Sequence, residues 1–410
     1  MIFIQIAAYR DPELLPTIQD CLAKARYKRD LRFGICWQRH ENDNTLDAFK
    51  RRKSFRIDKH LWHESQGLCW ARSRIQKMYE GEDYIMQLDS HHRFVQDWDV
   101  KLIESMELTG SAKPIITSYA GVFNPAVPEL TDQGPYKMVA DRFTPSGTIL
   151  FRPHIIQGWQ DLNKPVRARF VSGHFFFTLG RHCEEYRYDP MLYFAGDEIS
   201  LSIRSFTLGY DLFHPHRTYL WHEYTRQGRP KHWDDHVADN REKVGSLWHE
   251  RDKVSKRRLR QMLREEDNGE DISGYGLGDV RTHQEYERYA GINFAMRRLH
   301  RETVAGKEPP CTYVDDQQWN SSFLHEHTVE LKWTAADIDQ CSDHKFVYFG
   351  IEDHQGNVLY RYDASAQSEE TRGHIQRKSV TFSASTKPAK LIIWPVSHSR
   401  GWLNKIVHHL

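Results

Sequence analysis

Residues 83–94 read DYIMQLDSHHRF, a short apolar run that ends in polar residues. Five of the six residues before Asp89 carry no charge, a pattern that predicts a short buried strand. In an extended backbone, side chains two residues apart project to the same side, so Asp89 and His91 point together while Ser90 points away. A carboxylate oxygen and an imidazole nitrogen at one place suit a borderline divalent ion, with Mn²⁺ expected first and Mg²⁺ as the alternative. The stretch therefore predicts a metal site at the carboxyl end of a strand.

The Asp-x-His spacing alone is weak evidence for such a site. It recurs at residues 58–60 and 234–236, and one or two chance matches are no surprise in a chain of 410 residues with 24 histidines. Only Asp89 and His91 follow an apolar strand, and ligand sites in open α/β sheets lie beyond the carboxyl ends of strands. The metal site is therefore assigned to this pair.

Size and composition set the outer limits of function. The 410 residues allow two or three domains around a large core, and the net charge of +1 indicates no general attraction to nucleic acid or acidic membranes. No apolar run is long enough to span a bilayer, so we expect a soluble protein. The six cysteines lack the paired spacing of a zinc ribbon or a disulfide framework, which favours a reducing, cytoplasmic location. The oligomeric state stays open.

The chain opens with the elements of an α/β sheet. Residues 2–7 and 31–37 are apolar runs of β-branched type, and both are predicted strands. Between them, the DPE sequence at 11–13 predicts a helix start, with Asp11 as the capping carboxylate and proline at the first helical position. Strand, helix, strand is the right-handed unit of a nucleotide-binding sheet. The loop at 8–10 lies at its carboxyl end.

Two later helix starts carry candidate functional side chains. Arg72 lies in a predicted helix that leads into the strand of Asp89, where it can neutralise a diphosphate beside the metal, although a solvated surface arginine is the alternative. Asp197 and Glu198 follow Gly196 at the start of another helix. These acids can cap that helix, or they can serve catalysis or acceptor binding, because backbone can come close to a ligand at a glycine.

The last hundred residues differ in pattern from the rest. Residues 231–303 are charged and largely helical, and KEPP at 307–310 resembles a linker. Five short strand patterns with turn residues between them follow, which predicts a β-sandwich at 311–410 after a catalytic domain at 1–305. The sandwich is expected to bind an acceptor or partner, and its Trp394 and Trp402 could either stack on sugars or belong to its core.

Several motifs resemble, in their order along the chain, the cytoplasmic polypeptide N-acetylglucosaminyltransferases of the type that glycosylates hydroxyproline on a ubiquitin-ligase adaptor in protists. More distantly they resemble the polypeptide GalNAc transferases. The resemblance covers about residues 1–300 and leaves the last hundred residues unexplained. It rests on these motifs: AYRD (8–11), QLDSHHRF (87–94), FAGDEIS (194–200), GYD (209–211), HEYTR (222–226), RP (229–230), YGLGDVRT (275–282), Tyr286 and GI (291–292).

This resemblance implies a GT-A (Rossmann-like) fold, a UDP-sugar donor, a divalent metal and retention of anomeric configuration. The reaction would move N-acetylglucosamine or a related sugar to a hydroxyl of a protein or glycan, by front-face attack or through a covalent intermediate. The implied metal ligands are Asp89, His91 and His222, and Glu198, beside Asp197, would lie near the reacting sugar. The family usually has two glutamates where this chain has Asp197 and Glu198. The implied donor-binding residues are Ala8, Tyr9, Arg10, Arg72, Asp89 and Ser90.

Two other function classes compete with transfer. A metal-dependent hydrolase would suit a chain rich in histidine and aspartate, but there is no His-Glu-x-x-His helix. A sugar-binding protein with a decayed transferase site is the non-catalytic alternative, and the presence of Asp89, His91, Glu198 and His222 argues against decay.

Overall fold

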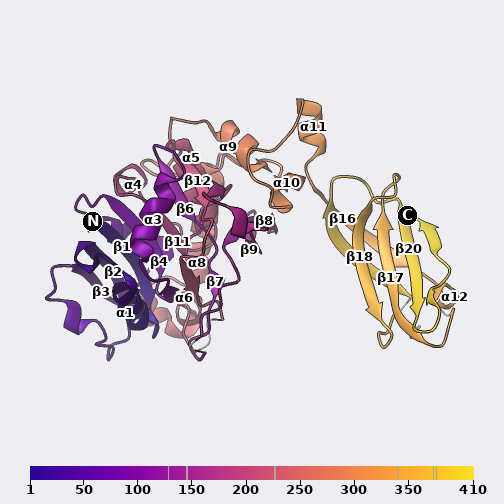
Figure 1. Ribbon diagram of the computed structural model, residues 1–410, viewed down its shortest axis with the longest axis horizontal. Coiled ribbons are helices and arrows are strands. Elements are labelled where there is room, and N and C mark those ends of the chain that lie inside the picture. The colour runs from indigo at the N-terminus through magenta and orange to yellow at the C-terminus, as the bar shows by residue number, and fades with distance from the viewer. Residues whose placement is uncertain (128, 145, 226–227, 339, 373, 375) are drawn as a thin grey trace. The chain divides into compact units, whose positions relative to one another are not determined.

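The structure is a computed structural model that describes residues 1–127, 129–144, 146–225, 228–338, 340–372, 374 and 376–410 (Figure 1). Arg226 of the HEYTR motif lies outside these described residues. The chain divides into two compact units, Met1–Cys311 and Thr312–Leu410. None of the helices formed by the described residues has the length and apolar character needed to cross a membrane.

A mixed eight-stranded sheet forms the centre of the first unit (Figure 1). Four neighbouring strands are parallel, and one antiparallel strand joins them to a second parallel pair. The α/β prediction is therefore confirmed. In spatial order the strands are β10 (Val166–Arg167), β12 (Asp211–His214), β6 (Pro114–Thr117), β11 (Phe175–Leu179), β4 (Tyr84–Asp89), β1 (Ile2–Tyr9), β2 (Leu31–Arg39) and β3 (Phe55–Leu61).

Helices cover both faces of this sheet because its strands are apolar on both sides. Along β1, Ile4 joins one core and Phe3 the other, as alternation in a strand requires. The core of Ile4 is covered by α1 (Leu14–Lys24) and α3 (Trp98–Glu107). The core of Phe3 is covered by α2 (Leu68–Gln76), α5 (Asp197–Thr207), α8 (Trp248–Met262) and α9 (His283–Ala290).

A small three-stranded sheet lies beside the carboxyl end of β4. It consists of β5 (His92–Phe94), β13 (Leu220–His222) and β7 (Gly121–Val122). The unit also contains the strand pairs β8 (Tyr136–Phe143) with β9 (Ile149–Ile155) and β14 (Ile292–Asn293) with β15 (Arg298–Leu299). Its short helices are α4 (His182–Glu185), α6 (His232–Asp235), α7 (Arg241–Val244) and α10 (Arg301–Val304), with 3₁₀ turns at Lys28–Asp30, Asp47–Phe49, Trp62–Glu64, Trp159–Asp161 and Ala238–Asn240.

The second unit is a β-sandwich, as its strand pattern predicts. Two sheets share one apolar core to which Leu331 contributes from one sheet and Val347 and Ile393 from the other. Trp402 is half exposed and its ring centroid lies 4.4 Å from that of Trp394. One sheet pairs β16 (His325–Lys332) with β19 (Arg377–Ala384). The other contains β18 (Val358–Ser365), β17 (His344–Glu352), β20 (Lys390–Ser397), β21 (Gly401–Trp402) and β22 (Ile406–His409), and the helices are α11 (Asp316–Ser321) and α12 (Ala335–Ile338).

Candidate active site

Strand pairing brings the three predicted metal ligands together. Asp89 ends β4, His91 follows after a bend, and β13 pairs with β5 so that His222 lies opposite His92. Asp89 Oδ2 is 3.6 Å from His222 Nε2 and 3.8 Å from His91 Nε2. One ligand atom from each of the three residues lies within 4.8 Å of the others, a spacing at which one ion could be held.

The chemistry of this cluster fits a divalent cation. Both ring nitrogens of the buried His222 lack a hydrogen-bond partner among the described residues. Burial lowers the pKa of His222 well below its usual value, so its imidazole is neutral and has a lone pair for a metal. Burial alone would raise the pKa of Asp89, but His222, His91 and Arg72 hold that pKa well below its usual range. An ionised carboxylate beside two imidazoles is a donor set that divalent transition metals prefer.

Asp11 supports His91, a role that its sequence position did not indicate. The Oδ2 atom of Asp11 lies 2.7 Å from His91 Nδ1 and accepts a hydrogen bond of 2.9 Å from Arg229. Among the described residues, its Oδ1 atom accepts a hydrogen bond from the Glu13 amide alone. Helix α1 begins at Leu14 with Glu13 as N-cap rather than at the DPE sequence itself. The predicted capping role of Asp11 therefore reduces to one local bond, and its other oxygen belongs to the site.

Ser90 also differs from the prediction that it points away from His91. The chain bends at this residue, and the Ser90 hydroxyl donates to Asp11 Oδ2 at 2.7 Å, the same oxygen that His91 contacts. Strict alternation applies only where the backbone stays extended, and here the strand ends at Asp89.

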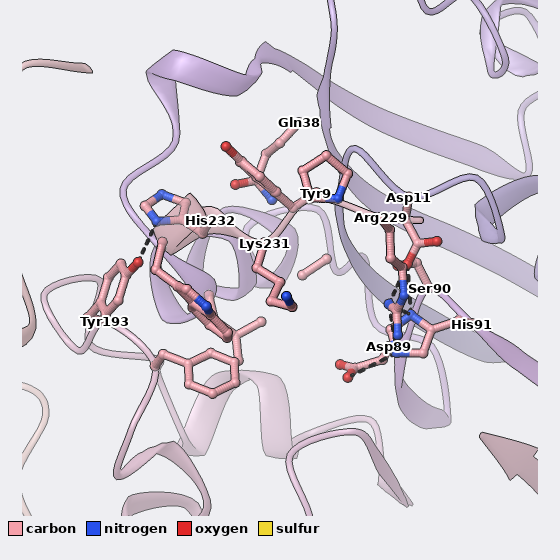
Figure 2. Close-up of a pocket in the computed structure, with 16 residues that line it drawn as sticks. Tyr9, Asp11, Gln38, Asp89, Ser90, His91, Tyr193, Arg229, Lys231 and His232 are labelled. Atoms are coloured by element: carbon pink, nitrogen blue, oxygen red, sulfur yellow. Dashed lines mark hydrogen bonds and ion pairs between the residues drawn. The ribbon is translucent and has the colours of Figure 1, made fainter. Parts of the chain in front are cut away.

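A cavity of about 130 Å³ lies beside this cluster and has an aromatic wall opposite it (Figure 2). Asp89 and His91 line the cavity, whereas His222 is not among the described residues that do so. Figure 2 shows Asp11, Asp89 and His91 on one side, with Tyr193 and His232 on the other. The Tyr193 hydroxyl lies 2.6 Å from His232 Nδ1, which fixes both rings. The polar side is lined by Asp11, Asp89, Ser90, His91, Arg229 and Lys231, and the aromatic side by Tyr9, Tyr193, Phe194, His232 and Trp233.

Only Tyr9 of the predicted loop at 8–10 lines this cavity. Ala8 is fully buried in the core that α1 and α3 cover. Ala7 lines the cavity instead, because alternate residues of β1 face the same side and Tyr9 faces the cavity. Arg10 pairs with Asp235 at 2.7 Å. The side chains of Ala8 and Arg10 therefore have other contacts in this structure, and a donor contact for either residue stays a prediction.

Arg72 lies beneath the cluster rather than on its surface. It is 2% exposed and is not among the described residues that line the cavity. Its guanidinium pairs with Asp197, lies 3.5 Å from Asp89 Oδ1 and donates to the Gly173 carbonyl at 2.5 Å. Arg72 is thus a buried arginine rather than a surface one, and its ion pair with Asp89 helps to hold that carboxylate in position.

The two acids at the start of α5 have different environments. Asp197 is buried and pairs with Arg72. Glu198 accepts hydrogen bonds from the Tyr119 hydroxyl at 2.8 Å and from the Gly173 amide at 2.9 Å, neither of which belongs to α5. Burial raises the pKa of Glu198 to about 7. These bonds do not cap α5, whereas a carboxyl group poised near neutral pH suits proton transfer.

Gly173 contacts both Arg72 and Glu198, through its carbonyl and its amide, and there is no room for a side chain at this position. A Cβ atom there would lie 2.9 Å from Asp197 Oδ2 and 3.3 Å from Glu198 Cγ. We expect Gly173→Ala to displace these acids and to lower turnover by roughly 10- to 100-fold. Gly276→Ala is the matched control, because none of the described atoms outside its two chain neighbours lies within 4 Å of a Cβ at that position. Equal turnover of the two variants in a donor-hydrolysis assay would show that the acids need no such exact placement.

Three aromatic side chains that the sequence did not single out pack behind the metal ligands. His92 Nδ1 lies 3.0 Å from the Asp89 carbonyl, and its Nε2 lies 3.3 Å from His174 Nδ1. His174 Nε2 lies 3.3 Å from the Tyr224 hydroxyl. His174 immediately precedes β11, and its carbonyl accepts a hydrogen bond of 3.1 Å from the Asp89 amide, but it lies in no motif that could have indicated it. His92 lies in the QLDSHHRF motif and Tyr224 in the HEYTR motif, which were signals for these two residues.

Comparison with known proteins bears on the family and the fold of the chain. The sequence matches the profile of the family described as Glycosyltransferase (GlcNAc) over residues 1–60 and 44–296. No curated protein matches the chain. A crystal structure of GalNAc-T7 with UDP, GalNAc and Mn²⁺ is similar with a TM-score of 0.50 and 12% identity, covering 100% of this chain and 72% of that one.

Two structures of S. aureus TarS are also similar. The first has a TM-score of 0.39 and 9% identity over 100% of this chain and 77% of that one. The second, TarS 1-349 with UDP-GlcNAc, has a TM-score of 0.36 and 11% identity over 56% and 60% of the two chains. The likeness to GalNAc-T7 identifies the fold of the first unit as GT-A. Because the family profile spans well over half of the chain, this protein belongs to the GlcNAc glycosyltransferase family.

Proposed function

We propose that this glycosyltransferase moves N-acetylglucosamine, or a related sugar, from a UDP-sugar to a hydroxyl of a protein or glycan, with a divalent metal and with retention of configuration. One observation carries the proposal: Asp89 and His91, which form a candidate metal cluster with His222, line the polar side of a cavity whose other wall is aromatic. A nucleotide-sugar donor has the matching chemistry, with a flat base at one end and a diphosphate at the other. The family assignment favours transfer over a metal-dependent hydrolase or a sugar-binding protein.

Different side chains in and beside the cavity would bind different parts of the donor. A divalent ion, Mn²⁺ before Mg²⁺, would be held by Asp89, His91 and His222 and would stabilise charge on the departing diphosphate. Lys231 lines the same side and adds positive charge. Tyr9 and Tyr193 offer aromatic surface for the base. The fold shared with GalNAc-T7, crystallised with UDP, GalNAc and Mn²⁺, accords with this arrangement.

Glu198 is proposed as the group beside the reacting sugar. Its raised pKa of about 7 lets it orient or deprotonate a hydroxyl near neutral pH, and it serves equally in front-face attack and in a covalent route. Asp197 is proposed as a positioning residue, because its carboxylate is already paired with Arg72.

A donor panel tests the proposed function. The purified chain would be incubated with UDP-GlcNAc, UDP-GalNAc, UDP-Glc and UDP-Gal, each with Mn²⁺, Mg²⁺ or EDTA, and UDP release would be measured. We expect slow hydrolysis that is fastest with UDP-GlcNAc and Mn²⁺ and is stopped by EDTA. Acceptor peptides with hydroxyproline, serine or threonine would follow. The proposal would be refuted if the chain neither released UDP nor bound any of the donors under these conditions.

The C-terminal sandwich is proposed to bind the acceptor or a partner. We expect residues 1–311 to fold without it and to retain donor hydrolysis, because all the site residues and their partners named above lie in the first unit. The cut should follow Cys311, since this buried side chain contacts Arg169 at 3.1 Å within the first unit. Melting curves and UDP release would be compared with those of the full chain. Loss of both folding and hydrolysis would assign the sandwich to the catalytic core.

A cytoplasmic location is part of the same proposal. Five of the six cysteines are buried free thiols, the form that a reducing compartment maintains.

A further inference from the structure

Arg229 brings a positive charge to the place where the metal ligands meet. Its Nη1 atom lies 2.5 Å from His91 Nδ1, 3.1 Å from His91 Nε2 and 2.9 Å from Asp11 Oδ2. Its Nη2 atom donates to the Glu223 carboxylate at 2.8 Å. The Arg229 side chain is 9% exposed, so this charge is largely withdrawn from water and is held by the two carboxylates.

Asp11 faces both partners and therefore links them. Its carboxylate is 3% exposed, and the same oxygen contacts the imidazole of His91 and the guanidinium of Arg229. Arg229 can only donate hydrogen bonds, so His91 Nδ1 accepts while Arg229 is in place. In the absence of Arg229, Nδ1 can donate a proton to this carboxylate, and Nε2, which lies 3.8 Å from Asp89, then has the lone pair for a metal. A carboxylate behind a histidine ligand fixes the tautomer and raises the basicity of the ligating nitrogen.

A metal bound to His91 would lie close to the guanidinium. Metal–imidazole bonds are about 2.0–2.2 Å long, and Arg229 Nη1 is only 3.1 Å from the same nitrogen. Two cations in a largely buried space repel each other strongly, and solvent screens them little.

We propose that Arg229 is a resident counter-ion that the divalent metal displaces from His91, and that Asp11 is the positioning residue that directs His91 to the metal. The inference rests on the metal site of the proposed function. On this proposal the metal takes the place of the Arg229 guanidinium at His91. Arg229 therefore lowers the affinity for the metal, and Asp11 raises it. Removing the charge of Arg229 strengthens metal binding, and removing the carboxylate of Asp11 weakens it.

Mn²⁺ affinity, measured without nucleotide, tests this inference independently of activity. Free Mn²⁺ would be counted by electron paramagnetic resonance in titrations of the full chain and its variants. We expect Arg229→Gln to bind Mn²⁺ on the order of tenfold more tightly, within the usual range of coupling between two sites. Arg229→Lys retains the charge and should stay near wild type. Asp11→Asn should bind roughly 10- to 100-fold more weakly, as for other side chains that support a metal ligand.

Arg93→Gln is the matched control for loss of one positive charge nearby. Arg93 pairs with Glu13 at 2.6 Å and has no contact with the ligands in the described structure, so its loss should leave Mn²⁺ affinity unchanged. Equal tightening by Arg93→Gln and Arg229→Gln, or none by Arg229→Gln, would overturn the exchange. Wild-type affinity in Asp11→Asn would overturn the positioning role. Failure of the wild-type chain to bind Mn²⁺ would instead overturn the metal site itself, and the inference with it.

Discussion

Asp89→Asn is expected to lower Mn²⁺-dependent donor hydrolysis by roughly 10³-fold, about 4 kcal/mol of transition-state stabilisation. The asparagine keeps the size of the side chain but removes the only carboxylate in the cluster of Asp89, His91 and His222. Without that charge, the cluster offers two imidazoles and no carboxylate beside the cation Arg72, a poor site for a divalent ion. The fold should survive because Arg72 keeps its pairing with Asp197. UDP release and Mn²⁺ affinity would be measured together with the melting temperature.

Asp83→Asn provides a control on the same part of the chain. Asp83 immediately precedes β4, its side chain is 68% exposed, and it pairs with the N-terminal amine. Exposed pairs of this kind contribute little to stability, so this variant should match wild type in hydrolysis and Mn²⁺ affinity. If Asp89→Asn also matched wild type, the metal assignment would be wrong at its central residue.

The sheet could be predicted because its signals are local. The apolar runs before Tyr9 and Asp89 each fill one strand, and their order with the intervening helices defines an α/β unit. When a strand is buried on both faces, its sequence does not indicate which of two adjacent small residues faces the site. Ala7 and Ala8 are chemically identical, and only the packing of both sheet faces decides that Ala7 lines the cavity.

The site could be predicted only in part because most of its contacts are distant in sequence. Asp89 and His91 lie two residues apart, so their spacing identifies them. His222 reaches them through the pairing of β13 with β5, and it was found by resemblance to a family motif. Asp11 looked like a helix cap because aspartate before proline and glutamate has that local meaning. Its bonds to His91 and Arg229 depend on the folded chain, which no local pattern encodes.

Glu198→Gln is expected to lower turnover by roughly 10²-fold or more, the usual contribution of a positioned acid–base group. Glutamine retains the length of the side chain and can still bond to the Gly173 amide and to Tyr119, so the backbone around α5 should not move. In the wild-type chain, kcat/KM should rise with an apparent pKa of about 7 if the ionised carboxylate is the active form. In the Glu198→Gln variant, this rise of kcat/KM with pH should be absent. Single-donor kinetics between pH 5 and pH 9 would measure both effects.

Melting temperatures separate chemistry from stability in this experiment. Burial raises the pKa of Glu198 from its usual 4.5 to about 7, so ionisation opposes folding, and its contribution to stability falls as pH rises between these values. Glutamine does not titrate, and Glu198→Gln should therefore melt progressively higher than wild type as the pH goes from 5 to about 7, with a constant difference above that pH. Glu265→Gln is the matched control: burial also raises the pKa of Glu265, which pairs with Arg297 at 3.1 Å and does not line the cavity in the described structure. It should not lose turnover, so a comparable loss in both variants would reduce Glu198 to a structural residue.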